Sequence, residues 1–364
     1  MDRMPSSPAP RRAQEVLVAP GRVLKATPVF ETYWRFAALR QHLFMRRVAG
    51  VLPPWTEDQV LASHRFTNAY RAADRVSQYL IRNVLYRGEQ TCEEIFFRTV
   101  LFKFFNRVET WEELETKLGG LSWKNFSFER YARVLDATMA GGERIYSAAY
   151  IMPSPSLGSA RKHRNHLRLL EQMMRDGAPL RVERARSLRE VFEILRAYPS
   201  LGPFLAFQFS IDLNYSEMLS FSEMDFVVAG PGARNGIQKC FVDTAGLDEA
   251  DLIRAVTDLA DREFERLGLY FPTLWGRPLQ LIDCQNLFCE VDKYARVMHP
   301  EFVGSSGRTR IKQRFAPRSS FLPQWYPPKW GLKIPPEIAS AGAWPRPRRR
   351  RSEQLNFGFS GGLE

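Results

Sequence analysis

Helix-start signals recur along the middle of this sequence, and each stands just before apolar residues at helical spacing. The signal is a Ser or Thr followed three residues later by Glu or Gln, because this pair can satisfy free backbone amides at a helix N-terminus. The pairs are Thr56 with Gln59, Thr91 with Glu94, Thr110 with Glu113, and Ser187 with Glu190. These repeated helix-start signals predict a chain built mainly from helices.

Apolar periodicity supports the same conclusion for several segments. After Thr91, an aromatic-rich stripe follows a helical face, and a second stripe follows Asp248. A further helix is predicted over residues 279–297. Strand signals are scarce, since only residues 226–228 and 237–242 are short apolar runs beside glycine, compatible with strands or with buried loop. We therefore expect an all-α core with small β or loop insertions.

Both ends of the sequence differ in composition from the middle. Residues 1–28 are rich in Pro, Ala, Ser and Arg, and residues 335–364 combine Pro with an Arg run that ends at Arg351. Such segments bury too little apolar surface to fold. We predict disordered tails at 1–28 and 335–364 around one helical domain at 29–334. The Arg run resembles a nuclear import signal or a phosphate-binding tail, and it is equally typical of a solvated tail.

Positive charge is concentrated near the C-terminus. The formal net charge is +12, and residues 301–364 hold 12 Lys and Arg against 4 Asp and Glu, a net of +8. This imbalance favours a polyanionic partner, nucleic acid first, because each phosphate that is neutralised releases a counterion. An anionic membrane surface and a basic tail without a specific partner are the alternatives.

Several sequence features favour a location inside a cell. No run of about 18 apolar residues is present, so no membrane span is expected, and the N-terminal residues lack the apolar core of a secretion signal. The four cysteines form no C-x-x-C pair and are expected to be reduced thiols. No metal site is predicted from these cysteines and five histidines. The expected location is the cytoplasm, with the nucleoid, or the nucleus in a eukaryote.

Residues 198–206 have the outline of a helix–hairpin–helix. They connect a capped helix that begins after Ser187 to a second apolar helix, through a turn that contains Gly202. In such hairpins a glycine lets backbone amides approach a DNA phosphate. A plain turn between two helices is the alternative.

A glycine-rich segment follows at residues 221–239. Its Gly230, Gly232 and Gly236, with a basic residue nearby, suggest backbone close to a phosphate or a base, although a structural turn fits equally well. No Gly-Lys dipeptide occurs in the chain, so this segment is not a nucleoside-triphosphate loop.

Two further segments carry acidic or amide side chains. Asp225 stands beside an apolar run, where desolvation would raise its pKa and suit it to act as a base; capping a helix is the alternative. Asp283, Asn286 and Glu290 fall on one face of a predicted helix. Such a polar face usually contacts solvent, and a binding role is the other interpretation.

Two basic stretches, at 161–168 and 308–314, lack acidic residues. The second leads into the aromatic residues Trp325, Tyr326 and Trp330. Cations beside exposed aromatic rings suit phosphate contact with base stacking, whereas buried rings would be core anchors. No serine or cysteine nucleophile with a histidine partner is visible, so a hydrolase is not predicted.

Several of these stretches resemble one protein family. They are residues 98–111 (RTVLFKFFNRVETW), 205–216 (LAFQFSIDLNYS), 225–233 (DFVVAGPGA) and 236–241 (GIQKCF). Over residues 30–330 the sequence resembles the helical domain of 5-hydroxymethyl-deoxyuridine DNA kinases, within the wider group of alpha-glutamyl/putrescinyl thymine pyrophosphorylases. The resemblance implies a helical fold related to helix–hairpin–helix DNA glycosylases and a role in hypermodification of thymine-derived bases in DNA.

The relation to glycosylases can be followed residue by residue. Pro199 and Gly202 match the hairpin, and Asp225 lies 23 residues after Gly202, in the place of the catalytic aspartate. Pro203 departs from the pattern because it removes an amide that could meet a phosphate. No lysine follows the hairpin glycine, so a Schiff-base lyase is not supported. Without a Walker-type loop, transfer of phosphate from ATP by a P-loop mechanism is not expected.

The resulting prediction is a DNA base-hypermodification protein that acts on a 5-hydroxymethyluracil-type base flipped from the duplex. Asp225 is the first choice for a catalytic carboxylate, and Asp212 is the second. The residues predicted to bind the base are Gln208, Asn214, Tyr215, Gly230, Gly232 and Asn286. The residues predicted to contact DNA are Gly202, Arg161, Lys162, Arg234, Lys239, Arg308, Arg310, Lys312 and Arg314.

The predicted activity is that of a kinase-like or pyrophosphorylase-like transferase without a P-loop, and the sequence identifies no cofactor. The predicted partners are DNA and a separate kinase or other base-modification enzyme. A non-catalytic DNA-binding subunit and a glycosylase-like repair enzyme are the alternatives. A cleft lined by both Asp212 and Asp225 would favour the enzyme, and a flat basic surface would favour the subunit.

Overall fold

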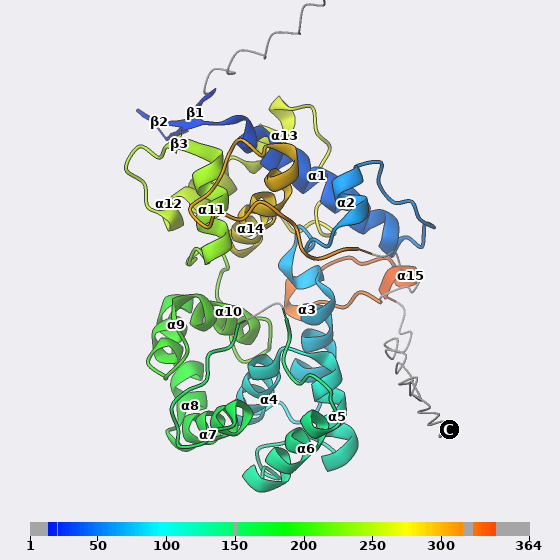
Figure 1. Ribbon diagram of the computed structural model, residues 1–364, viewed down its shortest axis with the longest axis vertical. Helices are drawn as coiled ribbons and strands as arrows, with labels where there is room; N and C mark the ends of the chain where they lie inside the picture. Colours follow the sequence, from blue (N-terminus) through cyan, green and yellow to red (C-terminus); the bar gives the residue numbers. More distant parts are fainter. Residues whose placement is uncertain (1–13, 20, 149–150, 316–322, 340–364) are drawn as a thin grey trace, which may run out of the picture.

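The computed structural model describes residues 14–19, 21–148, 151–315 and 323–339, and regular structure in this part of the chain is mainly helical (Figure 1). A small antiparallel sheet has the strand order β1–β2–β3. The predicted fold class, a mainly helical protein with small β insertions, is therefore confirmed.

The helices form two groups, one above the other in Figure 1. The upper group packs around the long helix α14 and carries the sheet on its outer side. Its elements are β1 (Gln14–Ala19), β2 (Arg22–Ala26), α1 (Pro28–Val48), α2 (Gln59–Ser63), α11 (Pro231–Cys240), β3 (Phe241–Asp243), α12 (Glu249–Asp258), α13 (Ala260–Arg266) and α14 (Leu281–Met298). Helix α14 contacts α1, α11 and α12 and is buried along most of its length.

The lower group surrounds α4, an apolar helix that is buried almost throughout. Its elements are α4 (Cys92–Phe105), α5 (Val108–Leu118), α6 (Phe128–Ala140), α7 (Lys162–Arg175), α8 (Ala178–Glu183), α9 (Leu188–Arg196) and α10 (Pro203–Asn214). The remaining elements are η1 (Arg71–Ala73), α3 (Arg75–Tyr79), the π-helical turn η2 (Leu80–Leu85), η3 (Pro328–Trp330) and α15 (Pro336–Ala339). The chain crosses between the groups at η1 and α3, and again between α10 and α11.

Local capping explains where several helices begin. Thr91 and Ser187 accept the amide protons of Glu94 and Glu190, and Asp248 caps α12, as the sequence predicts. The predictions at Thr56 and Thr110 are wrong. Helix α2 begins instead after Asp58, whose carboxylate accepts from the Leu61 amide. Thr110 lies inside α5, where its hydroxyl donates to the carbonyl oxygen of Ile145.

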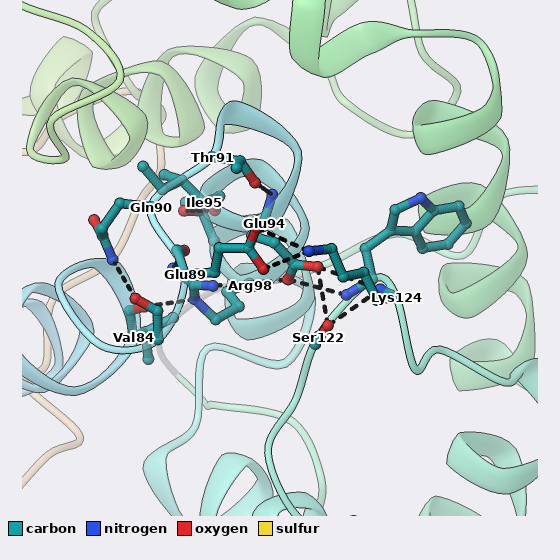
Figure 2. A network of polar contacts seen from close by, with 12 residues as sticks. Val84, Glu89, Gln90, Thr91, Glu94, Ile95, Arg98, Ser122 and Lys124 are labelled. Atoms are coloured by element: carbon teal, nitrogen blue, oxygen red, sulfur yellow. Dashed lines mark hydrogen bonds and ion pairs between the residues drawn. The ribbon is translucent and has the colours of Figure 1, made fainter.

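Helix α4 is fixed to the segments on both sides of it by two buried charged residues (Figure 2). The Glu94 carboxylate accepts from the Ser122 hydroxyl at 2.9 Å and from the Lys124 amide at 3.2 Å. The Arg98 guanidinium donates to the Val84 carbonyl oxygen at 3.0 Å, at the end of η2. Because buried charges need partners, these contacts set the position of α4.

The glycines at 232 and 236 allow α11 to pack closely on α14. A Cβ atom at Gly236 would lie 2.0 Å from the Phe288 carbonyl oxygen, and one at Gly232 would lie 3.0 Å from Cys289 Sγ. At Gly236 only a residue without a side chain fits against the α14 backbone, and at Gly232 a larger residue would require the Cys289 side chain to move. The segment predicted to approach a phosphate or base therefore approaches another helix.

The predicted disordered N-terminal tail is wrong for residues 14–26, which form the β1–β2 hairpin. Val16, Leu24 and Ala26 are buried in the core, and β2 pairs with the distant strand β3. This long-range pairing stabilises a segment whose composition alone indicates disorder. Residues 1–13 of that predicted tail lie outside the described residues, as do residues 340–364 of the C-terminal one.

The two short apolar runs that were compatible with strands, residues 226–228 and 237–242, adopt different structures. Residues 226–228 are irregular, and residues 237–240 end α11, so only the last part of the second run enters a strand, β3. At the C-terminal boundary, α15 lies within the predicted tail, and its Ile338 is buried. Among the described residues, no helix combines the length and apolarity needed to span a membrane.

Candidate functional site

A buried cluster of charged residues lies where η1 meets α4, α10 and α14. Arg71, at 3% exposure, donates from Nη1 to Asp212 Oδ1 at 2.7 Å and from Nε to Gln208 Oε1 at 3.0 Å. Its backbone amide donates to Asp283 Oδ1 at 2.7 Å. Lys103 Nζ lies 2.9 Å from Asp212 Oδ2. The cluster therefore joins the two groups of helices through ion pairs that water cannot screen.

The two carboxylates of this cluster have opposite protonation tendencies. Burial, together with the nearby charge of Glu223, raises the pKa of Asp283 to about 7. Burial also acts to raise the pKa of Asp212, but the positive charges of Arg71 and Lys103 outweigh it and leave this pKa below its usual value. Asp212 is therefore an ionised structural partner, whereas Asp283 titrates near neutrality.

A pocket of about 190 Å³ opens beside the cluster. Its lining residues come from the end of α10, the loop after it, the start of α14 and η3, and they are Asn214, Ser220, Phe221, Ser222, Glu223, Arg277, Gln280, Lys329 and Trp330. Gln280 connects pocket and cluster, because its backbone amide donates to Asp283 Oδ2 at 3.0 Å. The volume exceeds the ~150 Å³ of a cavity that accepts benzene, so one pyrimidine ring has room.

The wall of the pocket is charged and rigidly held. Arg277 donates to Glu223 Oε1 at 2.7 Å, and its guanidinium lies 3.8 Å from the centre of the Trp330 ring. Glu223 is buried, and burial raises its pKa although Arg277 opposes the shift. The result is a desolvated carboxylate and a stacked cation at the edge of one cavity, an arrangement able to exchange a proton with a bound polar group.

Lys329 closes the base of the pocket. Its ammonium donates to the carbonyl oxygens of Asn214 and Ser216, each at 2.6 Å, and to that of Leu219. Burial lowers its pKa to about 8. These carbonyls lie at and after the C-terminal end of α10, where a cation is favoured by the helix dipole. Lys329 therefore ties the C-terminal segment to the end of α10.

The two carboxylates predicted to be catalytic do not share a cleft. Asp212 lies in the buried cluster, and Asp225 is exposed at the surface, outside the pocket lining. The apolar neighbours Phe226 and Val227 turn into the core, while the Asp225 carbonyl oxygen accepts from Arg254. The desolvated setting predicted for Asp225 is therefore wrong, because a run of apolar neighbours in sequence says little about one side chain's own exposure.

Three of the residues predicted to bind the base are buried and have structural partners. Asn214 lines the pocket and exchanges two hydrogen bonds of 2.9 Å with the backbone of Phe221. The Tyr215 ring lies under the Arg71 guanidinium at 5.5 Å. Gln208 accepts from Arg71, as described above. Of these three predicted residues, only Asn214 reaches the pocket.

Two other predicted base contacts belong to helix packing. A Cβ atom at Gly230 would lie 2.6 Å from the Phe204 ring, and Gly232 faces Cys289, so neither glycine lines the pocket. Asn286 is half-buried on α14, also outside the pocket lining. The glycine-rich segment serves close contact between elements rather than contact with a base.

The helix–turn–helix outline at residues 198–206 is present as α9, a turn and α10. The left-handed residue of that turn is Ser200, with φ of 66°, whereas Gly202 has φ of −63° and stands before α10 as its N-cap. The reversal of the turn therefore depends on Ser200, and the contact of Gly202 with a DNA phosphate stays a prediction. Gly202 is exposed at the helix N-terminus, where its backbone remains accessible.

The predicted DNA contacts on helices are largely paired with acids. Lys239 is 2% exposed, and its ammonium lies 3.0 Å from Asp292 Oδ1, so its predicted contact with DNA is wrong. Arg161 contacts Asp136 at 2.5 Å, and Arg234 lies 3.5 Å from Glu249. The fourth predicted residue, Lys162, lies 4.3 Å from the Tyr146 ring centre.

The basic segment 308–314 is exposed and attached to the upper group of helices. The side chains at its surface are those of Arg308, Arg310, Lys312 and Arg314. Its backbone is held by hydrogen bonds from the Arg65 amide to the Gln313 carbonyl oxygen and from the Phe315 amide to that of Ser63. The aromatic residues that follow are different, because Tyr326 is buried and Trp330 stacks in the pocket wall.

Sequence reasoning missed Arg71, Glu223, Arg277 and Lys329. The sequence does point to Asp283, but on the helix face expected to contact solvent Asp283 and Glu290 are buried and only Asn286 is half-buried. The available signal was the acid Glu223 within a segment already selected for its glycines. Among the described residues, no group of His, Cys, Asp and Glu side chains is arranged to hold a metal ion.

The chain belongs to the 5-hmdU DNA kinase helical-domain family, because the model of that family matches residues 27–304. The resemblance predicted from the sequence is thereby confirmed. The chain is similar to the 5-hmdU DNA kinase of Bacillus phage SP10, with 28% identity over 288 residues, which cover 73% of this chain and 45% of the relative. The chain thus spans a little under half of that relative's length. No solved structure matches it.

Proposed function

We propose that this protein takes part in DNA base modification, by receiving a 5-hydroxymethyluracil-type base in the Glu223–Arg277 pocket and acting on its 5-substituent. The observation that carries the proposal is the pocket itself, which places a buried carboxylate and a stacked arginine around space for one pyrimidine. Family membership and the activity named for the phage relative support the same class of substrate.

Each wall residue has a chemical task in this proposal. Glu223 accepts the proton of the 5-hydroxymethyl hydroxyl, because burial raises the pKa of its carboxyl and makes it a stronger base. Arg277 orients Glu223 and stabilises negative charge that develops on the hydroxyl oxygen. Asp212 acts indirectly, by holding Arg71 beneath the site. A P-loop does not supply the transferred group, because the sequence has no Gly-Lys dipeptide.

Contact with the duplex is assigned to two exposed features. The first is the basic segment 308–314, whose cations can neutralise phosphates. The second is the N-terminus of α10 at Gly202, which has no side-chain cap. A base must leave the stack to enter a closed pocket, so phosphate contacts on the duplex would hold the DNA while it is extruded.

A non-catalytic DNA-binding subunit is the second candidate. It is favoured by one observation, that Asp212 is buried and Asp225 lies outside the pocket, so these two carboxylates do not form a catalytic pair. In that case the protein would present a modified base to a separate kinase or another base-modifying enzyme.

Mass spectrometry of nucleosides separates these functions. A duplex that contains 5-hydroxymethyluracil is incubated with the protein and ATP, digested and analysed, with Glu223→Gln as the matched variant. A new mass on the modified nucleoside that Glu223→Gln fails to produce supports the proposal. Tight binding without any new mass indicates the subunit, and release of a free base indicates a glycosylase.

A further inference from the structure

A second pocket, of about 180 Å³, opens where the end of α4 and the start of α5 meet α3. Its charged lining residues are Arg75, Arg107, Arg144 and Glu109. Arg75 begins α3, Arg107 precedes α5, and Arg144 lies in the loop after α6. Three guanidinium groups against one carboxylate give this lining a positive charge.

Ion pairs hold two of the arginines in place. Glu109 Oε1 lies 3.6 Å from Arg75 Nη2, and Glu109 Oε2 lies 3.3 Å from Arg107 Nε. Arg107 also lies 3.9 Å from Glu143. In the described part of the chain, Arg144 has no carboxylate within ion-pair distance, so its charge is available to a ligand. Arginine is suited to this role because its planar fork matches the oxygens of a phosphate.

The first turn of α5 adds backbone donors to the same pocket. Arg107, Val108 and Glu109 line it, and they are the residue before the helix and the first two residues of the helix. No side chain caps this N-terminus. The hydroxyl of Thr110, which could have served nearby, donates to the Ile145 carbonyl oxygen. Free amides at the positive end of a helix attract an anion.

Asn106 supplies a side-chain donor to the same pocket. It lines the pocket, is 4% exposed, and uses its Oδ1 to accept from Lys103 Nζ at 3.0 Å. Because the lysine is a donor, the amide must turn its oxygen inward and its Nδ2 donor toward the pocket. Among the described residues, no protein acceptor lies within hydrogen-bond distance of this Nδ2, so it can donate to a ligand in the pocket.

We propose that this second pocket binds a phosphate group, held by Arg107, Arg144, Asn106 Nδ2 and the first amides of α5. The proposal goes beyond the base pocket and does not depend on it. The phosphate can belong to the DNA backbone or to a free nucleotide or pyrophosphate, since the same donors suit both. The two sites are linked, because Lys103 contacts Asn106 on one side and Asp212 of the buried cluster on the other.

Calorimetric titration with inorganic pyrophosphate tests the free-phosphate source. Arg144→Gln and Asn106→Asp are the informative variants, and Arg130→Gln, at an exposed position on α6, is the control for loss of one charge. Asn106→Asp keeps the oxygen that Lys103 needs and replaces the Nδ2 donor with an acceptor. Each informative variant should weaken binding about ten- to a hundredfold, as expected for loss of a charge-assisted hydrogen bond, and the control should bind normally.

Fluorescence anisotropy with a short duplex tests the DNA source with the same variants. Weaker duplex binding by Arg144→Gln, with competition by pyrophosphate, assigns the site to a backbone phosphate. Weaker pyrophosphate binding with unchanged duplex binding assigns it to a free phosphate. The proposal is overturned if both ligands bind folded Arg144→Gln and Asn106→Asp as they bind the original protein, or if neither ligand binds the original protein.

Discussion

At the scale of single residues, the surroundings of each carboxylate in the fold distinguish the acidic residues that the sequence makes look alike. Asp212 and Asp225 have similar sequence surroundings. Each lies among apolar residues, in a segment that resembles the same protein family. In the structure Asp212 lies between two buried cations, whereas Asp225 is exposed. Glu223, two residues before Asp225, is the one that reaches the pocket. The sequence points to the segment that lines the pocket but not to the side chain that reaches it, because irregular backbone has no periodicity from which to infer direction.

Asp212→Asn should destabilise the protein strongly. The substitution leaves Arg71 and Lys103 buried without a countercharge, a change that costs about 3–5 kcal/mol in comparable buried pairs. Urea unfolding at neutral pH measures the loss, and Asp225→Asn is the matched control, with little change expected at an exposed site. Equal stability of the two variants would contradict the ionised role assigned to Asp212.

Glu223→Gln should reduce base modification by about two to four powers of ten, the usual contribution of a general base. The amide keeps the shape of the side chain and an oxygen for Arg277, so binding of DNA should change little. Single-turnover assays on 5-hydroxymethyluracil DNA measure the effect. Asp225→Asn should remain active, and a loss confined to Asp225→Asn would return the catalytic role to the residue first predicted.

The pKa of Asp283, raised to about 7, predicts a specific pH dependence of stability. A carboxyl whose folded-state pKa is raised stabilises the fold fully below its unfolded pKa, near 4, and loses this contribution as pH rises through 7. Asp283→Asn removes the titration. The variant should therefore gain stability relative to the original protein by roughly 1–3 kcal/mol between pH 5 and pH 8. Thermal unfolding of both proteins across this range tests the sign, and a constant difference would refute it.

At the scale of elements, local chemistry predicted helices well and long-range contacts poorly. Thr91, Ser187 and Asp248 begin helices as expected, because the cap and its amide are close in sequence. Thr110 carries the same signal inside a helix, since the contact of its hydroxyl with residue 145 is invisible to a local pattern. The β1–β2 hairpin was missed for a related reason, as its pairing partner β3 is more than 200 residues away.

Gly236→Ala should separate α11 from α14. The added Cβ would meet the Phe288 carbonyl oxygen at 2.0 Å, and backbone on both sides cannot move aside cheaply. Overpacking of this kind costs about 1–3 kcal/mol or more. Chemical unfolding measures the loss, with Gly120→Ala as control because a Cβ there meets nothing within 4 Å. Full stability of Gly236→Ala would show that the helices tolerate a wider spacing.

At the scale of the whole molecule, positive charge and the pocket are carried by different parts of the chain. If roughly five cations contact phosphates, log affinity for a duplex should fall against log salt with a slope near −4 to −5. Charge reversal at Arg310 and Lys312 should weaken binding to all sequences alike and make this slope shallower. Reversal at Lys117 and Arg133, exposed on α5 and α6 at the opposite end in Figure 1, is the control. A slope near zero for the original protein would exclude phosphate contact as the main source of affinity.

The hydrogen bonds from Lys329 to the end of α10 determine when the pocket can form during synthesis of the protein. The family match ends at residue 304, yet Lys329 and Trp330 complete the pocket. During synthesis, both groups of helices leave the ribosome before these two residues do. The nascent protein can therefore pack its helices while its cavity still lacks a wall, and the pocket is complete only when the segment with Lys329 and Trp330 packs on the core.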